Sequence, residues 1–320
     1  MLPRMPSSPG SAVDDWFARR TTSWHDRPDL EDLLAAKAGR TVGLVVPALD
    51  EQDTVGDVIG AVLADPVTRA LLDEVVVMDG GSVDATRERA AAAGARVVRT
   101  ADVAPGHPSG GKGGSVWRAL LVTRSDVLVV VDADLDPFDP GWVTALAAPL
   151  LLDPTTHLVK GAADRPLSVD GIEHPRSGGR VTELVARPLL NAFWPELAGF
   201  VQPLSGELAA RRSLLERLPF VTGYGLEIGM LVDALALVGL DGLAQVDLGE
   251  RRHRHQSDLA LGRMASAVLR TALSRRGHED LPSALLQFAR DDDGRLAGTP
   301  ADVTLHELPP VESLGGHAAG

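Results

Sequence analysis

Two carboxylates stand close together after a strongly apolar segment. Residues 126–131 read DVLVVV, and Asp132-Ala133-Asp134 follows directly. Carboxylate oxygens are the ligands that Mg²⁺ and Mn²⁺ prefer, and nucleotide phosphates commonly complete the shell of such ions. An ordinary polar turn between a strand and a helix could have the same composition. Because residues 127–131 are all apolar, the sequence favours a site for Mg²⁺, or alternatively Mn²⁺, at this pair.

A glycine-rich segment carries one lysine just before a predicted helix. Residues 105–115 read PGHPSGGKGGS, with Lys112 near the end. Backbone N–H groups of such a turn at a helix N-terminus suit an anionic phosphate. The segment is not a P-loop, because Gly113 follows the lysine where Ser or Thr would be needed. A flexible linker is the alternative, and it is weakened by the rarity of lysine, since the chain has three lysines against 28 arginines.

Basic side chains gather in a third place. Residues 250–255 read ERRHRH and follow a predicted strand over 242–248. Alternation along an extended segment would put Arg251, His253 and His255 on one side. Histidine can bind a metal and arginine can bind phosphate through two hydrogen bonds. A solvated surface is the alternative, and nucleic acid is not an expected partner because no aromatic side chain is interleaved.

The first two predicted strands also end in polar residues. Asp50 and Glu51 follow the apolar run at 41–47 and would project from the strand end; alternatively, Asp50 or Asp53 would cap the next helix. Asp79 and Gly80 follow the apolar run at 74–78, where glycine permits close approach of a ligand to the backbone. The segment that begins with Asp79 and Gly80 lacks a dinucleotide-binding fingerprint, and an ordinary turn explains it equally well.

The elements that must position these groups alternate between strands and helices. Apolar segments predict strands over 41–47, 74–78, 126–131 and 158–161, separated by helices over 53–63, 84–93, 113–122 and 140–151. This alternation is typical of an α/β fold with a parallel sheet covered on both faces. Ligands of such sheets bind beyond the carboxyl ends of the strands, where the polar groups lie. Further along, the pattern predicts a loop at 164–180, helices over 181–193, 226–238 and 259–275, and a loose tail over 290–320.

Composition limits the class of protein. The 320 residues include 44 acids and 31 Lys and Arg, for a formal charge of −13, and no cysteine. Disulfides, thiolate metal sites and cysteine nucleophiles are therefore excluded, and general nucleic-acid binding is disfavoured. No apolar run is long enough to cross a bilayer, and the first residues lack a secretory signal pattern. We expect a cytoplasmic protein with neither a membrane nor a nucleic-acid partner.

These motifs together resemble a known family. PALDEQ at 47–52, DGGSVD at 79–84, GGKG at 110–113 and VVVDADL at 129–135 are similar to nucleotide-sugar glycosyltransferases of the GT-A type. Four later segments narrow the resemblance to the actinobacterial glucosyl-3-phosphoglycerate synthases: SGGRVTELVARPLL (177–190), QPLSGELAARRSLL (202–215), GYGLEIGMLVDAL (223–235) and AQVDLGERRHRH (244–255). The resemblance spans residues 34 to 275.

The resemblance implies a retaining glycosyltransferase with a Rossmann-like GT-A fold. It would move glucose from UDP-glucose to the 2-hydroxyl of 3-phospho-D-glycerate, with Mg²⁺ as cofactor and a homodimer as the assembly. The chain would divide into an N-terminal extension, partly disordered (1–33), a nucleotide-sugar-binding α/β domain (34–160), an acceptor-binding and metal-completing part (161–280) and a tail (281–320). A mannosyl-3-phosphoglycerate synthase using GDP-mannose, a polyprenyl-phosphate glycosyltransferase and an inactive nucleotide-sugar-binding regulator are the alternatives.

Site roles carry over from the matching motifs. The donor site would comprise Pro47, Ala48, Leu49, Glu51, Asp79, Gly80, Lys112, Asp132, Glu227 and Arg251. The acceptor site would comprise Gly179, Arg180, Thr182 and His255. The metal would lie on Asp134 and His253, and the catalytic set would be Asp134, Glu227 and Arg180.

Three positions depart from the family pattern. Asp50-Glu51-Gln52 stands where relatives often have Asn-Glu-Glu, Gly80 stands in place of Ser, and His255 in place of Asn. The first two leave the choice between UDP- and GDP-sugars open. The third bears on acceptor binding.

Overall fold

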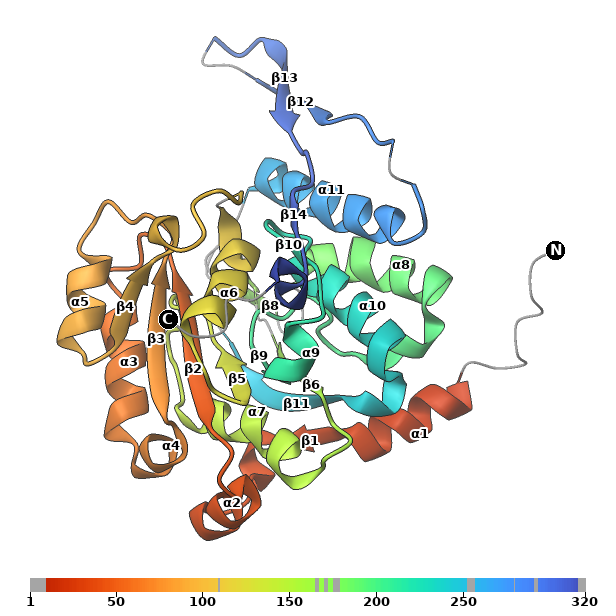
Figure 1. Cartoon of the computed structure of the whole chain (residues 1–320). Coiled ribbons are helices and arrows are strands. Elements are labelled where there is room, and N and C mark those ends of the chain that lie inside the picture. Colours follow the sequence, from red (N-terminus) through yellow and green to blue (C-terminus); the bar gives the residue numbers. More distant parts are fainter. Residues whose placement is uncertain are drawn as a thin grey trace.

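A sheet of eight strands runs through the described part of the chain, in the order β1-β11-β6-β9-β5-β2-β3-β4 (Figure 1). The computed structural model describes residues 10–108, 110–164, 167–169, 172–174, 179–251, 257–278, 280–290 and 293–315. The strands are β1 (Thr21–Ser23), β2 (Val42–Ala48), β3 (Glu74–Asp79), β4 (Arg96–Arg99), β5 (Val127–Val130), β6 (Leu158–Asp164), β9 (Leu208–Arg211) and β11 (Leu243–Glu250). Neighbouring strands are parallel except where β9 pairs with β5 and β6. The predicted α/β fold with a mostly parallel sheet is confirmed.

Helices cover both faces of the sheet, as the apolar strands require. Along β5, Val127 and Val129 belong to one buried cluster, whereas Leu128 and Val130 belong to the other. One cluster includes side chains of α6 (Gly111–Val122), α8 (Arg187–Phe193), α9 (Arg212–Leu215), α10 (Leu226–Val238) and α11 (Asp258–Ser274). The other includes side chains of α2 (Leu30–Lys37), α3 (Val55–Ala64), α4 (Pro66–Leu71), α5 (Thr86–Ala92) and α7 (Gly141–Leu152). No helix of the described residues is long and apolar enough to span a bilayer.

Strand β9 was not predicted. It lies between β5 and β6 and runs antiparallel to both, with Leu208, Ala209 and Ala210 buried. Its sequence LAAR is short and contains no β-branched or aromatic residue, so propensity gives no signal for a strand. Its position comes from pairing with two strands that are distant in the sequence.

One further prediction for the second half was wrong. The loop expected at 164–180 includes a small pair of strands, β7 (Leu167–Val169) and β8 (Ile172–His174). The helix expected over 181–193 is confirmed; its first part, Thr182–Ala186, is π-helical, and the rest is α8.

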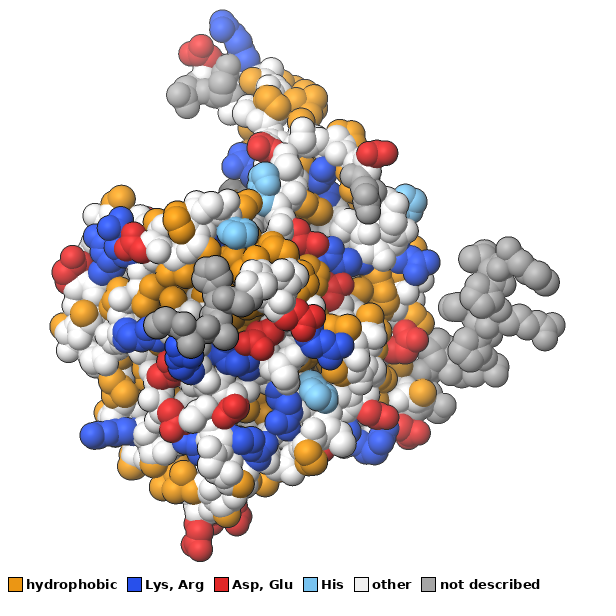
Figure 2. All heavy atoms as spheres, in the orientation of Figure 1, with side chains coloured by type: hydrophobic (Ala, Val, Ile, Leu, Met, Phe, Trp, Pro, Cys, Tyr) orange, Lys and Arg blue, Asp and Glu red, His pale blue; other side chains and the backbone are white. Residues whose placement is uncertain are grey.

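The expected loose tail is also structured where it is described. Strands β12 (Ala284–Arg290) and β13 (Leu296–Asp302) form a hairpin that stands away from the body (Figure 1), with apolar side chains visible on it (Figure 2). Next, β14 (Glu307–Leu308) pairs with β10 (Phe220–Val221), and the 3₁₀ turn Val311–Leu314 follows. The Trp117 indole donates a hydrogen bond to the Pro309 carbonyl over 2.8 Å, which fixes this segment to α6.

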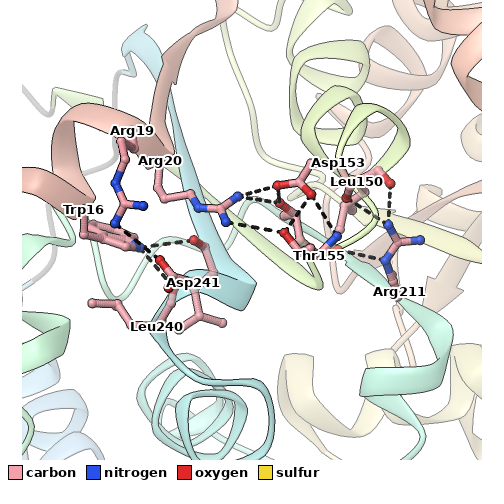
Figure 3. Close-up of polar contacts among 11 residues, drawn as sticks. Trp16, Arg19, Arg20, Leu150, Asp153, Thr155, Arg211, Leu240 and Asp241 are labelled. Carbon is pink, nitrogen blue, oxygen red and sulfur yellow. Dashed lines mark hydrogen bonds and ion pairs between the residues drawn. The ribbon is translucent and has the colours of Figure 1, made fainter.

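The N-terminal segment is part of the same sheet, and its side chains make polar contacts with later segments of the chain (Figure 3). Helix α1 (Gly10–Arg20) leads into β1, which pairs with β11 and forms the sheet edge. The buried Trp16 indole donates to the carbonyls of Leu240 and Leu243 over 3.1 and 3.2 Å. The Arg20 guanidinium donates to the Asp153 carboxylate at 2.5 Å. The domain boundary predicted between residues 160 and 161 falls inside β6, so the sheet includes residues from both sides of that boundary.

We expect the Trp16→Ala substitution to lower the free energy of unfolding by about 3–5 kcal/mol, because it removes a fully buried indole and leaves a cavity. Urea unfolding would measure this. Phe17→Ala is the matched control, since Phe17 is 41% exposed and its loss should cost about 0.5 kcal/mol or less. Equal losses in both variants would show that Trp16 does not anchor α1.

Candidate active site

The carboxyl ends of β2, β3 and β5 bring the predicted groups to one edge of the sheet. Ala48 at the end of β2 lies beside Asp79 at the end of β3, and β5 ends two residues before Asp132. The chain order reverses here, because β3 and β5 lie on opposite sides of β2. A reversal of this kind opens a crevice at the strand ends, which is where α/β proteins bind ligands.

The loops after β2 and β3 are joined by side chains of both. The Asp50 carboxylate accepts a hydrogen bond from the Val83 N–H at 2.9 Å, and the Gln52 side-chain oxygen accepts one from the Ala85 N–H at 3.1 Å. Helix α3 begins after Thr54 without a side-chain cap, so neither Asp50 nor Asp53 caps it. Asn and Glu, which the family pattern would place at positions 50 and 52, have side-chain oxygens that could accept the same hydrogen bonds. Both departures from that pattern therefore keep a hydrogen-bond acceptor at each position.

Asp79 is enclosed beneath this pair of loops. Its carboxylate accepts from the Ser82 N–H at 3.0 Å and faces Arg87 at 3.4 Å. Leu49, on the other loop, is exposed. A Cβ on Gly80 would lie 3.3 Å from the Ala48 carbonyl oxygen, so the site has little room for the serine of the family pattern. The assignment of Pro47, Ala48, Leu49, Glu51, Asp79 and Gly80 to the donor site stays a prediction.

The Asp132 and Asp134 carboxylates share one arginine. The Arg251 Nη2 lies 3.2 Å from Asp132 and 3.0 Å from Asp134, while the ammonium of Lys112 pairs with the other oxygen of Asp132. Burial acts against the charged form of Asp132, but Lys112 and Arg251 outweigh it and hold its pKa well below the usual range. The structure thus brings together four of the predicted site residues, counting Lys112 and Arg251 with the two aspartates.

The glycines around Lys112 allow a close approach of two chain segments. A Cβ on Gly113 would lie 1.9 Å from the Val221 carbonyl oxygen, so α6 can pack against β10 only with glycine there. The Lys112 side chain turns into the site and also donates to the Gly206 carbonyl at 2.7 Å. Burial alone would lower the pKa of Lys112, but Asp132, Glu227 and Glu207 raise it, so the ammonium stays charged.

Two buried residues of the site were missed by the sequence analysis. Lys160, on β6, donates to the Ser205 carbonyl at 2.5 Å, and Glu207, which directly precedes β9, pairs with Arg251. Burial lowers the pKa of Lys160 to about 8, with Glu227 opposing the shift. Both residues had a signal: Lys160 interrupts the apolar run LVKGAA, and Glu207 precedes the apolar run LAA.

Glu227 lies in the first turn of α10 at the same place. Burial raises the pKa of its carboxyl, and the positive charges of Lys112 and Lys160 oppose this rise. Including Glu227, the described groups here are four carboxylates and three cationic side chains, so the formal charge of the cluster is −1 with all seven ionised. That charge and the oxygen donors of Asp132 and Asp134 suit a divalent cation.

The described residues do not complete a metal site by themselves. No three His, Asp or Glu side chains within them are grouped as ligands for one ion. The predicted second ligand, His253, and the predicted acceptor residue His255 lie in 252–256, outside the described residues. Asp134 is 38% exposed, so its carboxylate is accessible to an ion with further ligands.

Three of the predicted acceptor residues, Gly179, Arg180 and Thr182, lie just before or at the start of the π-helical segment that precedes α8. Arg180 pairs with Asp258, at the start of α11, over 2.6 Å, and Thr182 is buried. Gly179 has φ of +80°, a conformation that favours glycine. Gly179, Arg180 and Thr182 therefore lie together at the start of this helical segment. Their role in acceptor binding stays a prediction.

Comparisons with known proteins agree with this geometry. The family model described as glycosyl transferase family 2 matches residues 44–203. The glucosyl-3-phosphoglycerate synthase of Mycolicibacterium smegmatis is 48% identical over 295 residues, covering 91% of this chain and 96% of that protein. The chain belongs to the glucosyl-3-phosphoglycerate synthases.

Solved structures match over nearly the whole chain. A glucosyl-3-phosphoglycerate synthase from Mycobacterium tuberculosis, in complex with Mn²⁺, UDP-glucose and phosphoglyceric acid, has a TM-score of 0.80 and 43% identity and covers 92% of this chain and 99% of that chain. The mannosyl-3-phosphoglycerate synthase from Rubrobacter xylanophilus has a TM-score of 0.85 and 38% identity, and covers 95% and 98% respectively. The resemblance and the GT-A fold inferred from the motifs are confirmed.

Because of Lys160, the free energy of unfolding should depend on pH in the alkaline range. Its pKa is lowered from 10.5 to about 8 by burial, so between these values the unfolded chain holds a proton that the folded chain has released. The contribution of Lys160 to the free energy of unfolding therefore rises with pH in this window, by at most about 1.4 kcal/mol per pH unit. Urea unfolding across the window would detect the rise in the wild type and its loss in Lys160→Met. Lys37→Met, a lysine at the end of α2, should retain it, and a rise retained in Lys160→Met would contradict the assignment.

Gly206→Ala should disturb the cation arrangement without unfolding the protein. The added Cβ would lie 2.2 Å from the Lys112 Nζ and 2.7 Å from an Asp132 oxygen, so that pair must move. We expect the rate of nucleotide-sugar transfer to fall on the order of 100-fold, as ångström-scale displacements at active sites do. Gly60→Ala on α3, where a Cβ meets nothing within 4 Å, is the control and should keep its activity. Unchanged transfer in Gly206→Ala would show that this pair does not position the donor.

Proposed function

We propose that the protein transfers glucose from UDP-glucose to the 2-hydroxyl of 3-phospho-D-glycerate, giving glucosyl-3-phosphoglycerate. The observation that supports this most is the pair Asp132 and Asp134 after β5, which forms ion pairs with Lys112 and Arg251. The chain that carries this pair belongs to the glucosyl-3-phosphoglycerate synthase family. In the reaction the bond from the anomeric carbon to the diphosphate breaks and a bond to the acceptor oxygen forms. UDP leaves, and the hydroxyl proton passes to the departing phosphate.

The residues of the site have distinct parts in this proposal. Asp134 and His253 would hold Mg²⁺ or Mn²⁺, which when bound neutralises charge on the leaving diphosphate. Asp132 and Lys112 would support the nucleoside, and Arg251 would contact the diphosphate. Arg180, with Gly179, Thr182 and His255, would bind the acceptor carboxylate and phosphate and hold its hydroxyl beside the anomeric carbon.

Glu227 would bind glucose hydroxyls rather than act as a covalent nucleophile. Burial raises the pKa of Glu227, and Lys112 and Lys160 beside it favour the carboxylate. A carboxylate paired in this way is a good hydrogen-bond acceptor for sugar hydroxyls. Retention would then follow from attack on the same face that the diphosphate leaves.

A second candidate function has a specific observation in its favour. The Rubrobacter xylanophilus structure with a TM-score of 0.85 is a mannosyl-3-phosphoglycerate synthase. Transfer of mannose from GDP-mannose to the same acceptor is therefore the alternative. The inactive-regulator hypothesis has less support, because Asp134 and its cationic neighbours are all present.

We propose a homodimer, for which the β12–β13 hairpin offers apolar surface (Figure 2). Its side chains Leu286, Phe288 and Leu296 are exposed, with Phe288 at 65%. A cytoplasmic location fits two phosphorylated substrates and a chain without cysteine.

A donor-by-acceptor activity matrix tests the function. UDP-glucose, GDP-glucose and GDP-mannose would each be assayed with 3-phosphoglycerate, 2-phosphoglycerate and glycerate. We expect UDP-glucose with 3-phosphoglycerate to give the highest kcat/KM, and Asp134→Ala to reduce it at least about 100-fold because the metal loses a ligand. Asp57→Ala, an exposed carboxylate on α3, is the control. Highest activity with GDP-mannose would support the alternative, and full activity of Asp134→Ala would refute the metal assignment.

A further inference from the structure

Three consecutive residues before β9 each hold one cation of the site. The Ser205 carbonyl accepts from Lys160 at 2.5 Å, and the Gly206 carbonyl accepts from Lys112 at 2.7 Å. The Glu207 carboxylate pairs with Arg251. The three cations come from β6, from α6 and from the residue after β11, so this tripeptide joins three separate elements.

Glu207 cannot itself contact a substrate. Its side chain is 1% exposed. One carboxylate oxygen accepts from the Arg251 Nη1, and the other accepts from the Ser205 hydroxyl at 2.8 Å. An enclosed carboxylate with both oxygens engaged acts through the group that it holds, which here is the guanidinium of Arg251.

Arg251 is held by its backbone and by Glu207, while its Nη2 is shared between two aspartates. Its side chain is 4% exposed, and its backbone N–H donates to the Asp164 carbonyl at 2.8 Å. While Nη1 stays on Glu207, Nη2 reaches both Asp132 and Asp134, at 3.2 and 3.0 Å. A guanidinium freed from Glu207 could turn and bind the Asp134 carboxylate through two parallel hydrogen bonds, the strongest arrangement for this pair.

We propose that Glu207 is a positioning residue that keeps Arg251 from closing over Asp134, so that this carboxylate remains available to the metal and Nη2 remains available to the diphosphate. The inference rests on the proposed function, because it assumes that a metal and a nucleotide diphosphate bind here. Glu207 also contributes one of the four negative charges that attract a divalent cation to the cluster.

Direct binding of Mn²⁺ in the presence of UDP tests the proposal. Partners that orient a metal site from outside its ligand set typically change metal affinity by roughly 10- to 100-fold when replaced. We expect Glu207→Gln, which keeps the shape and removes the charge, to weaken Mn²⁺ binding by about 10-fold or more. Isothermal titration calorimetry and the Mn²⁺ electron paramagnetic resonance signal would measure this without turnover. In steady-state assays the KM for the sugar nucleotide should rise, with the KM for the acceptor unchanged.

A matched carboxylate at the other end of the sheet serves as control. Glu74, on β3, likewise pairs with a serine hydroxyl and an arginine: Ser125 at 2.6 Å and Arg96 at 3.3 Å. Glu74→Gln should therefore lower the melting temperature but leave Mn²⁺ binding unchanged. Ser205→Ala, which removes one of the two contacts of Glu207 and keeps the charge, should weaken binding by a smaller factor and covers the case in which Glu207→Gln does not fold.

The outcomes separate the proposal from the function on which it rests. Wild-type affinity for Mn²⁺ and UDP in folded Glu207→Gln, or in Ser205→Ala if the former does not fold, would overturn the positioning role alone. An equal weakening in Glu74→Gln would overturn it too, by showing a general effect of stability. A wild-type protein that binds Mn²⁺ with neither UDP nor GDP would overturn both the proposed function and this inference.

Discussion

Compensation among seven charged side chains at one end of the sheet is the constraint on which the site depends. Lys112, Lys160 and Arg251 oppose four carboxylates, among them Asp132 and Glu207, in a largely enclosed space. A buried charge that loses its partner costs several kcal/mol, so each member needs the others in place. Since the seven come from β6, α6, α10 and the ends of β5, β9 and β11, the cluster forms only when the second half of the chain has packed on the first.

The antiparallel direction of β9 explains how backbone carbonyls reach the charged site. A parallel strand presents its carboxyl end to the crevice, whereas β9 enters the sheet there and presents its amino end. Its preceding residues therefore bring backbone carbonyls, such as those of Ser205 and Gly206, into a region otherwise reached by the residues that follow strands. Those carbonyls bind ammonium groups without adding further net charge.

Much of this arrangement could be predicted from the sequence, for reasons that the structure makes plain. Segments that are almost entirely apolar, such as 74–78, predicted their strands to within a residue, because burial on both faces requires such a pattern. The Asp132–Asp134 pair was found because it follows such a segment. Lys160 and Glu207 were not assigned a role, since their importance comes from contacts between residues 45 and 44 positions apart, which periodicity does not encode. The same holds for β9 and for the ordered tail around Pro309.

The pairing of β1 with β11 has a consequence for how the chain is made. The Trp16 indole contacts Leu240 and Leu243, which are synthesised more than 220 residues later. Until β11 has emerged from the ribosome, α1 and β1 have no partner in the sheet, and the apolar edge of β6 stays uncovered. Closing contacts over so long a loop is slow, and exposed strand edges favour association with other chains. The nascent protein would thus be most exposed to misassembly just before the strand that delivers Arg251 takes its place.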